Sequence, residues 1–300
     1  MTAVDMSVQK YLSRIGFVSP AVPSLDVLRS VHTCHLTSVP FEDLTIHSGG
    51  QVQLQLPLLY DKIVNHRRGG FCYEINSLFS WLLTELGFRV TLLSAQVKNA
   101  VTGRYGPPLD HLTLMVKLQG QRWLCDVGVG VPGFSVPLSL DTSAPQEQGH
   151  RVYRIRREEG MHFLEWQKEE NRGVDGDWTE IYKFTLESRG LEDFAEMCRY
   201  HQSSPSSIFF CKSLCTVLKA GGRLTLIGHK LTTTTFPTLE TKGVLETRTR
   251  ELKNEEIPGV LAEEFGIMLK NPLIPKDEAI TPPPVMAERK IDNNKNSSMV

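Results

Sequence analysis

Cys72 is the residue whose type and position most clearly suggest catalysis. It follows Arg68-Gly69-Gly70-Phe71, and the two glycines predict a tight turn that leads directly into a helix. A thiol at a helix N-terminus lies at the positive end of the helix dipole, close to free backbone N–H groups. This position favours the nucleophilic thiolate, and the same N–H groups could bind an oxyanion. Cys72 is therefore a candidate nucleophile; the alternative is a buried, inert cysteine beside a helix end.

A nucleophilic cysteine needs a base and a third group that orients the base. His111 opens an apolar segment after a loop rich in Gly and Pro, and Asp126 closes the next one. Gln119-Gly120-Gln121 between them predicts a hairpin turn, so the start of one strand lies beside the end of the other. His111 and Asp126 can thus be neighbours, which predicts a Cys/His/Asp triad. The alternatives are a surface histidine at a strand end and an aspartate that serves the turn before Gly128.

The surrounding segments must hold these three residues, and they predict helices first and strands afterwards. Apolar residues at helical spacing from Ile75 to Leu86 predict a buried helix that begins at Cys72 and ends at Gly87. Ser24 and Pro57 mark the starts of two earlier helices. Further helices are predicted over 191–202 and 253–265, and strands over 89–97, 111–118, 122–126, 151–157, 162–168, 180–186, 208–218, 223–228 and 242–248.

The order of these elements predicts the fold class. Helices come first, then an antiparallel sheet or barrel, then a mixed segment of strands and helices, which is typical of an α+β protein. A doubly wound parallel sheet is disfavoured because strands and helices do not alternate. The tail is polar and rich in proline, so we expect residues 282–300 to be disordered.

Composition excludes several classes of function. The chain has 33 Lys and Arg against 34 Asp and Glu, which argues against broad electrostatic binding to nucleic acid or to an anionic membrane. No signal peptide or long apolar stretch is visible, so we expect a cytoplasmic protein without a membrane span. The six cysteines are scattered, and no second Cys/His pair accompanies Cys211 and Cys215. We therefore expect reduced thiols and no metal site.

These residues, in this order, resemble the arylamine N-acetyltransferase family. The family motif Arg-Gly-Gly-aromatic-Cys stands here as residues 68–72, and Pro-Phe-Glu-Asn-Leu stands as residues 40–44, with Asp43 in place of Asn. Asp-x-Gly-x-Gly stands as residues 126–130. Other matching segments are His111–Leu114, Leu191–Phe194, Ser204–Ser207 and Ile274–Lys276. The resemblance covers about residues 7–281, and it is the order and spacing of the motifs together that make it specific.

The resemblance implies a fold of three parts with a core like that of cysteine proteases and transglutaminases. Residues 1–88 would form a helical bundle that carries the nucleophile. Residues 89–190 would form an antiparallel β-barrel that carries the histidine and the aspartate. Residues 191–281 would form an α/β lid. Glu42 and Arg68 are candidates for a buried pair that braces the catalytic turn; the alternative is two unrelated surface charges.

The resemblance also implies a ping-pong acetyl transfer. Cys72 would attack the thioester of acetyl-CoA, and the acetyl-cysteine would pass its acyl group to an arylamine or a hydrazine. His111 would activate the thiol and handle the amine proton, and Asp126 would orient His111. The partners would be acetyl-CoA as co-substrate and a small amine, and the protein would act as a monomer without a metal. The implied CoA contacts are Arg104, Gly106, Pro107, Pro108, Tyr200, Ser206 and Thr281; the implied acceptor contacts are Val97, Asp110 and Val129.

Two departures from the family concern the substrates. Pro107-Pro108 stands where the common human-like forms carry Thr-Gly, and Val131-Pro132-Gly133-Phe134 lacks their Arg and Tyr. The insertion that mammalian forms carry near residues 165–180 is shorter here. The runner-up is a thiol hydrolase or a transglutaminase-like enzyme with the same triad, which would not need CoA. A catalytically silent protein on the same fold is disfavoured because all three triad residues are present.

Overall fold

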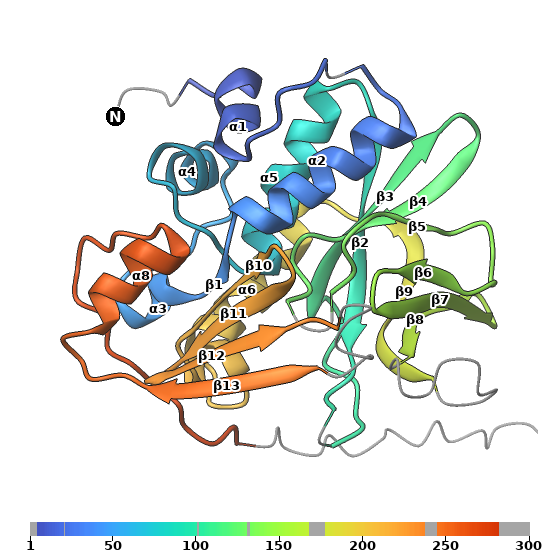
Figure 1. The fold of residues 1–300 in the computed structure, drawn as a ribbon. Helices are drawn as coiled ribbons and strands as arrows, with labels where there is room; N and C mark the ends of the chain where they lie inside the picture. Colours follow the sequence, from blue (N-terminus) through green and yellow to red (C-terminus); the bar gives the residue numbers. More distant parts are fainter. Residues whose placement is uncertain are drawn as a thin grey trace, which may run out of the picture.

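The structure is a computed structural model that describes residues 5–20, 22–100, 102–130, 133–167, 178–237 and 245–281. Helices predominate up to residue 86, and strands predominate beyond it (Figure 1). The helical part contains α1 (Val8–Arg14), α2 (Leu25–Ser38), the short strand β1 (Phe41–Glu42), α3 (Leu44–His47), α4 (Leu56–Tyr60), the π-helical turn η1 (Asp61–Asn65) and α5 (Cys72–Glu85).

The helix α5 lies at the centre of the helical part. Its apolar side chains, among them Ile75, Phe79 and Leu82, are fully buried in a core shared with α1, α2, α4 and η1. Gly87 follows the helix with φ of +88°, a left-handed conformation that ends helices and favours glycine. The helix predicted from Cys72 to Leu86 is therefore confirmed.

The middle of the chain forms an eight-stranded antiparallel sheet in the order β5-β4-β3-β2-β9-β8-β7-β6. The sheet curls into a nearly closed barrel, in which β5 near one edge contacts β7 near the other (Figure 1). Its strands are β2 (Arg89–Val97), β3 (His111–Leu118), β4 (Gln121–Cys125), β5 (Leu138–Ser139), β6 (Gln146–Gln148), β7 (Arg151–Glu158), β8 (Met161–Gln167) and β9 (Thr179–Ser188).

The strand β3 is buried on both faces and thereby joins the barrel to the helices. Leu112, Leu114 and Val116 belong to the core around α5, whereas Met115 belongs to the core inside the barrel. Because side chains alternate along a strand, His111 lies on the same face as Met115. The base is therefore held at the end of the barrel, next to the helix that begins with Cys72.

The last part of the chain forms a second sheet in the order β1-β10-β11-β12-β13. Its first strand comes from the helical part, since Phe41 of β1 pairs with Thr216 of β10. This part contains the 3-10 turn η3 (Leu191–Phe194), α6 (Ala195–Ser203), α7 (Ile208–Cys211), β10 (Leu214–Lys219), β11 (Gly222–Ile227), β12 (Lys230–Thr235), β13 (Glu246–Glu251) and α8 (Ile257–Phe265).

Some predicted elements in this part are wrong in extent. The strand predicted over 208–218 begins with the helical turn α7, because Ser207 Oγ accepts a hydrogen bond from Phe209 N and caps that turn. The strand predicted over 242–248 overlaps β13 from residue 246. The helix predicted from 253 begins at Ile257, beside Pro258.

Two predictions fall on residues outside the described part of the chain. These are the disordered tail over 282–300 and most of the shortened insertion near 165–180, since residues 168–177 are not described. Among the residues that the structure describes, no helix combines the length and the apolarity that crossing a membrane requires.

Candidate active site

Cys72, His111 and Asp126 meet where the N-terminus of α5 faces the end of the β3–β4 hairpin. Their exposed fractions are 2%, 3% and 0%. His111 Nε2 lies 2.7 Å from Asp126 Oδ2, and the side chain of Cys72 lies close enough to His111 to raise the pKa of its imidazole. Because His111 Nε2 is hydrogen-bonded to Asp126, the other ring nitrogen, Nδ1, is the one that can exchange a proton with the Cys72 thiol. The geometry brings together a thiol, a base and an orienting carboxylate, which is the arrangement of a thiol nucleophile.

The hairpin brings the base and the carboxylate together by its register. The last paired positions are Leu114 and Cys125, so Asp126 lies one position beyond the ladder. His111 is then its diagonal neighbour on the same face of the sheet, and such neighbours are within reach of long side chains. The expectation that this hairpin makes His111 and Asp126 neighbours is confirmed.

Asp126 keeps His111 protonated. Burial alone would lower the pKa of the imidazole, but the Asp126 carboxylate and the Cys72 sulfur overcome that effect and raise the pKa to about 10. In turn, burial would raise the pKa of Asp126, but the His111 imidazolium and its other hydrogen bonds lower it. The pair is therefore an imidazolium and a carboxylate at neutral pH, and the imidazolium lies beside the Cys72 side chain.

Asp126 is also held by groups that the motifs do not reveal. Its Oδ1 accepts hydrogen bonds from Asn76 Nδ2 and Gly128 N, both at 2.9 Å. Its Oδ2 accepts a second hydrogen bond from the hydroxyl of Tyr182 at 3.0 Å. Tyr182 is on β9 and fully buried. The carboxylate is thus fixed from four directions and points one oxygen at His111.

Asn76 connects the nucleophile's helix to the hairpin. It lies one helical turn after Cys72, so both side chains are on the same face of α5. Its amide donates to Leu112 O at 2.7 Å as well as to Asp126, and its carbonyl accepts from Val127 N at 3.0 Å. The i, i+4 spacing from Cys72 is the sequence signal that could have identified it.

His32 holds the backbone of Asp126 from α2. Its Nδ1 hydrogen-bonds to Ser135 O at 3.0 Å, and Asp126 N donates to its Nε2 at 3.2 Å. Burial lowers the pKa of His32 to about 4, so the ring is neutral and its Nε2 can accept. His32 and Asp126 are 94 residues apart in the chain, and no local sequence pattern connects them.

Gly128 allows the segment after Asp126 to pack directly against the nucleophile. A Cβ at this position would lie 2.8 Å from Cys72 Cα and 2.8 Å from Asn76 Nδ2. Both distances are too short for real contacts, so only glycine fits without displacing α5. This explains in physical terms why a glycine stands two residues after the aspartate.

Glu42 braces the turn that leads into α5. It is fully buried, and its two carboxylate oxygens accept hydrogen bonds from Arg68 Nε and Nη2, both at 3.0 Å. Gly69 N also donates to it at 3.1 Å, and Leu44 N donates at 2.8 Å. Burial would raise the pKa of Glu42, but Lys62 and Arg68 lower it to about 2. The predicted buried pair between Glu42 and Arg68 is confirmed.

Comparison with known proteins gives the family. The model of the N-acetyltransferase family matches residues 24–274. Arylamine N-acetyltransferase 1 of Homo sapiens is 34% identical over 285 residues, which cover 90% of this chain and 97% of that protein. The chain belongs to the arylamine N-acetyltransferase family. Its members are acyltransferase enzymes, so the predicted enzyme class and fold class are confirmed.

Solved structures of the family share this fold. The arylamine N-acetyltransferase of Mycobacterium smegmatis has a TM-score of 0.76 and 31% identity, and the match covers 88% of this chain and 93% of that one. The Mycobacterium marinum enzyme, solved in complex with CoA, has a TM-score of 0.75 and 28% identity, with coverage of 87% and 93%.

The residues that the family resemblance assigns to CoA come from separate segments that contact one another. Thr281 N donates to Pro205 O at 2.9 Å, which places the end of the described chain beside Ser206. Ser206 is half-buried, and Thr281 is exposed.

A second set of contacts connects α6 to the loop before β3. Ser207 Oγ is hydrogen-bonded to Nδ1 of His201, the neighbour of Tyr200, at 2.9 Å. The other ring nitrogen of His201 lies 3.5 Å from Asp110 Oδ1. In the loop itself, Gly106 N donates to Val97 O at 2.9 Å, and Arg104, Pro107 and Pro108 are exposed.

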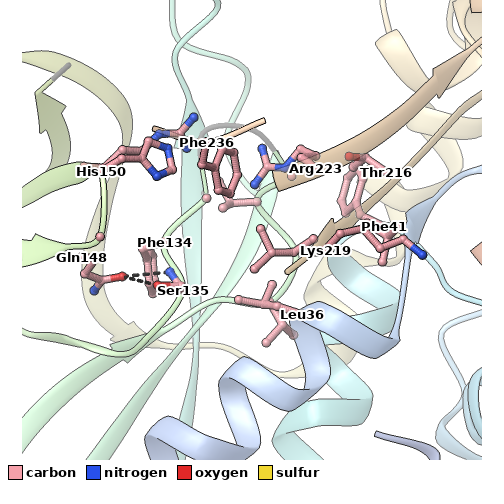
Figure 2. A pocket seen from close by; sticks show the side chains of 18 of the residues that line it. Leu36, Phe41, Phe134, Ser135, Gln148, His150, Thr216, Lys219, Arg223 and Phe236 are labelled. Carbon is pink, nitrogen blue, oxygen red and sulfur yellow. Dashed lines mark hydrogen bonds between the residues drawn. The ribbon is translucent and has the colours of Figure 1, made fainter. Parts of the chain in front are cut away.

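The three residues assigned to the acceptor are not all together. Asp110 Oδ2 accepts a hydrogen bond from Val97 N at 3.2 Å, so these two are adjacent. Val129 instead lines a cavity of about 250 Å³ between the barrel, α2 and the second sheet (Figure 2). Cys72, His111 and Asp126 do not line that cavity. Within the described residues, no cluster of three or more His, Cys, Asp or Glu side chains could hold a metal ion.

Proposed function

We propose that this protein transfers an acetyl group from acetyl-CoA to the nitrogen of an arylamine, an arylhydrazine or a related small amine. The observation that carries the proposal is that buried Cys72 lies beside His111, which is hydrogen-bonded to Asp126, in a chain that belongs to the arylamine N-acetyltransferase family. The protein of Mycobacterium marinum was solved with CoA, which supports acetyl-CoA as the donor.

In the first half-reaction, the Cys72 thiolate attacks the carbonyl carbon of the acetyl thioester. The backbone N–H groups at the start of α5 stabilise the negative oxygen of the tetrahedral intermediate. The intermediate collapses, the bond from carbon to the CoA sulfur breaks, and the His111 imidazolium gives its proton to the departing CoA thiolate. The products are CoA and an acetyl-cysteine.

In the second half-reaction, the amine nitrogen attacks the acetyl carbon of the acetyl-cysteine. His111, now neutral, accepts the proton that the amine loses, and the Cys72 thiolate leaves. Asp126 stabilises the imidazolium that forms and keeps Nδ1 directed at the sulfur. The amide product departs, and the thiolate–imidazolium pair is restored.

CoA approaches, in this proposal, over the connected segments described above. The loop with Arg104, Gly106, Pro107 and Pro108 forms one side. Tyr200, Ser206 and Thr281 form the other side. Two contacts support this path. Asp110, at the end of the loop, lies near His201 on α6. Tyr73, the neighbour of Cys72, donates its hydroxyl to Leu109 O at 2.7 Å.

The acceptor amine is assigned to the region of Val97, Asp110 and Val129. The three parts of the chain have separate roles in this proposal. Residues 1–88 supply the nucleophile, residues 89–190 supply the base and the Asp126 carboxylate, and residues 191–281 form the lid. We further propose that the protein is cytoplasmic and monomeric. All six cysteines are free thiols, which supports a reducing compartment.

The experiment that tests this function is the intact mass after incubation with acetyl-CoA and no amine. We expect the wild-type chain to gain one acetyl group, about 42 Da, since covalent catalysis leaves the acyl group on the nucleophile. Adding an arylamine should remove the gain and release the acetylated amine.

Cys72→Ala and Cys34→Ala are the matched pair for this test. Loss of the adduct in the first and its retention in the second assign the acetyl group to Cys72. An adduct that water removes as fast as the amine would support a thiol hydrolase instead. An adduct that persists in Cys72→Ala would overturn the assignment.

A further inference from the structure

Arg14 is a buried cation that the proposed chemistry does not use. It is the last residue of α1 and is 7% exposed. Among the residues that the structure describes, no carboxylate forms an ion pair with it. Burial, and then repulsion by Arg67, lowers the pKa of Arg14 to about 10, so the guanidinium is still charged at pH 7. Because an unpaired buried charge is costly, other groups of the protein must stabilise it.

Four backbone carbonyl groups surround the guanidinium of Arg14. Its Nη1 donates to Ser38 O at 2.7 Å, and its Nε donates to Ile63 O at 3.1 Å. Its Nη2 donates to Arg67 O at 3.2 Å and to Arg68 O at 3.4 Å. Ser38 and Ile63 lie in the last turns of α2 and η1, where carbonyl groups lack a partner within the helix and carry partial negative charge. Backbone dipoles from three separate segments therefore stabilise the cation.

Arg67 has a backbone conformation that needs such support. Its φ is +53°, in the left-handed region that residues other than glycine rarely adopt. It follows His66, which caps the C-terminus of η1, and glycine is the usual residue at this position. Arg68 N closes the turn by donating to Lys62 O at 3.0 Å. Because Arg14 binds the carbonyl groups of Arg67 and Arg68, it fixes the two peptide units that follow the strained residue.

The turn that Arg14 binds leads directly to Cys72 and is tightly packed. A Cβ at Gly69 would lie 1.8 Å from Pro40 O, so the backbone of the turn is in direct contact with the segment before β1. Glu42 accepts a hydrogen bond from Gly69 N at 3.1 Å, whereas Arg14 donates to carbonyl groups of the same turn. The two side chains thus hold different backbone groups, and neither can replace the other.

We propose that Arg14 is a positioning residue for Cys72. Its guanidinium holds Arg67 in the left-handed conformation, and that conformation fixes the place at which α5 begins. Without the guanidinium, the carbonyl groups lose their buried donor, Arg67 relaxes, and Cys72 moves away from His111. Arg14 touches no substrate and acts only through the turn between η1 and α5. The consequence for catalysis rests on the proposed role of Cys72 as the nucleophile.

Hydrogen–deuterium exchange of the full chain tests this role without any substrate. In Arg14→Met, whose side chain has similar length but no donor, we expect the backbone amides of residues 66–71 to exchange at least about tenfold faster. The amides of β10, β11 and β12 should exchange as in the wild type. Unchanged exchange over 66–71, or an equal rise in both regions, would overturn the proposal. Arg14→Lys, which keeps the charge but lacks the planar fork, replaces Arg14→Met if that variant does not fold.

A second substitution separates the left-handed turn from general stability. Glycine adopts a positive φ freely, so Arg67→Gly should remove most of the need for the guanidinium. When it is combined with Arg14→Met, we expect exchange over 66–71 to return to within about threefold of the wild-type rate. Glu159→Gly is the matched control, because Glu159 is exposed, has φ of +48° and lies in the turn between β7 and β8. Recovery with both glycines, or with neither, would contradict a local role of Arg14.

Single-turnover acetylation by acetyl-CoA measures the effect on the nucleophile. In Arg14→Met, we expect the maximal rate to fall at least about tenfold, because small displacements of reacting groups have large effects. The acetyl-CoA concentration at half-maximal rate should stay within about twofold, and Arg67→Gly should restore most of the rate. A normal maximal rate, or a change in the half-maximal concentration alone, would overturn the positioning role. If the wild type gains no acetyl group, the proposed function fails, and the exchange measurement still decides whether Arg14 holds the turn.

Discussion

At the scale of single residues, exposure and chemical reactivity rank two cysteines, Cys34 and Cys72, in opposite orders. Cys34 is partly exposed, whereas Cys72 is 2% exposed. Burial raises the pKa of the Cys34 thiol, while Cys72 lies beside the His111 imidazolium, whose pKa is about 10. If access decided the rate, Cys34 would be alkylated first.

We expect the opposite order, because the thiolate is the reactive form of cysteine. Iodoacetamide should modify Cys72 before Cys34 at pH 7, and acetyl-CoA should protect Cys72 alone. Peptide mass analysis of a time course measures both rates. Faster labelling of Cys34, or labelling of Cys72 that acetyl-CoA leaves unchanged, would contradict a reactive thiolate on Cys72 beside the His111 imidazolium.

The chemically active residues of the site could be predicted from sequence, but their supports could not. Cys72 follows a glycine turn, and a short hairpin separates His111 from Asp126, so local spacing is enough to identify each of the three as a candidate catalytic residue. Tyr182 and His32 reach Asp126 from β9 and α2. Those contacts depend on how the barrel closes and how α2 packs, and no local pattern records either event.

At the scale of elements, Gly128 sets the distance between α5 and the segment after β4. Gly128→Ala would place a methyl group 2.8 Å from Cys72 Cα, so α5 must shift and the triad must open. We expect activity to fall by about 100-fold or more, since small displacements of reacting groups have effects of that size. We also expect a lower melting temperature.

Gly259→Ala is the matched control for that substitution. Nothing lies within 4 Å of a Cβ at Gly259, which is in α8. Alanine is favoured over glycine in helices by about 1 kcal/mol, so this variant should be fully active and slightly more stable. Similar losses of activity in both variants would show that the Gly128 effect is not local.

The pair between Glu42 and Arg68 joins β1 to the turn before α5. Glu42→Gln removes a fully buried charge that receives two hydrogen bonds from Arg68. Breaking one side of a buried pair typically costs about 3–5 kcal/mol. Urea unfolding monitored by circular dichroism should show a loss of this size.

Asp26→Asn makes the same chemical change in an exposed pair. The Asp26 side chain is 94% exposed and lies 4.0 Å from Arg29, so its loss should change stability by about 0.5 kcal/mol or less. Equal effects of the two substitutions would mean that Glu42 does not brace the turn.

Elements with a clear apolar period were predictable, and elements defined by their neighbours were not. The period of α5 and the alternation of β2 and β3 fix those elements locally. The sequence Lys230–Thr235 has four successive threonines and no alternation, yet it forms β12 because β11 and β13 pair with it on both sides. Hydrogen-bonded pairing with neighbouring strands therefore determines the strand conformation of a segment whose own sequence does not predict it.

At the scale of the whole molecule, Asp43 attaches the second sheet to the helical part. Its Oδ1 accepts a hydrogen bond from Leu214 N at 2.8 Å, and Asp43 N donates to Leu214 O at 3.2 Å. Its Oδ2 is buried without a hydrogen-bond partner among the described residues. Burial, and then the negative charge of Glu42, raise the pKa of Asp43 well above its usual value.

The raised pKa of Asp43 makes stability depend on pH. The native state keeps a proton that the unfolded state loses above its own pKa of about 4, so stability falls as pH rises through the interval between the two pKa values. Asp43→Asn removes this effect. The variant should be more stable than the wild type by about 1–3 kcal/mol at pH 7, and the difference should shrink towards pH 4. Urea unfolding at both pH values measures it, and a difference that does not change with pH would contradict the account.

The pairing of β1 with β10 has a consequence for synthesis on the ribosome. β10 follows β1 by more than 170 residues, so at about 5–20 residues per second roughly 9 to 35 seconds separate their appearance. During that interval, Glu42 can already hold Arg68 and Gly69, while the other edge of β1 waits for its partner. The nascent chain can thus form the turn before Cys72 early. Its strand β1 can pair with β10 only when most of the protein has been made.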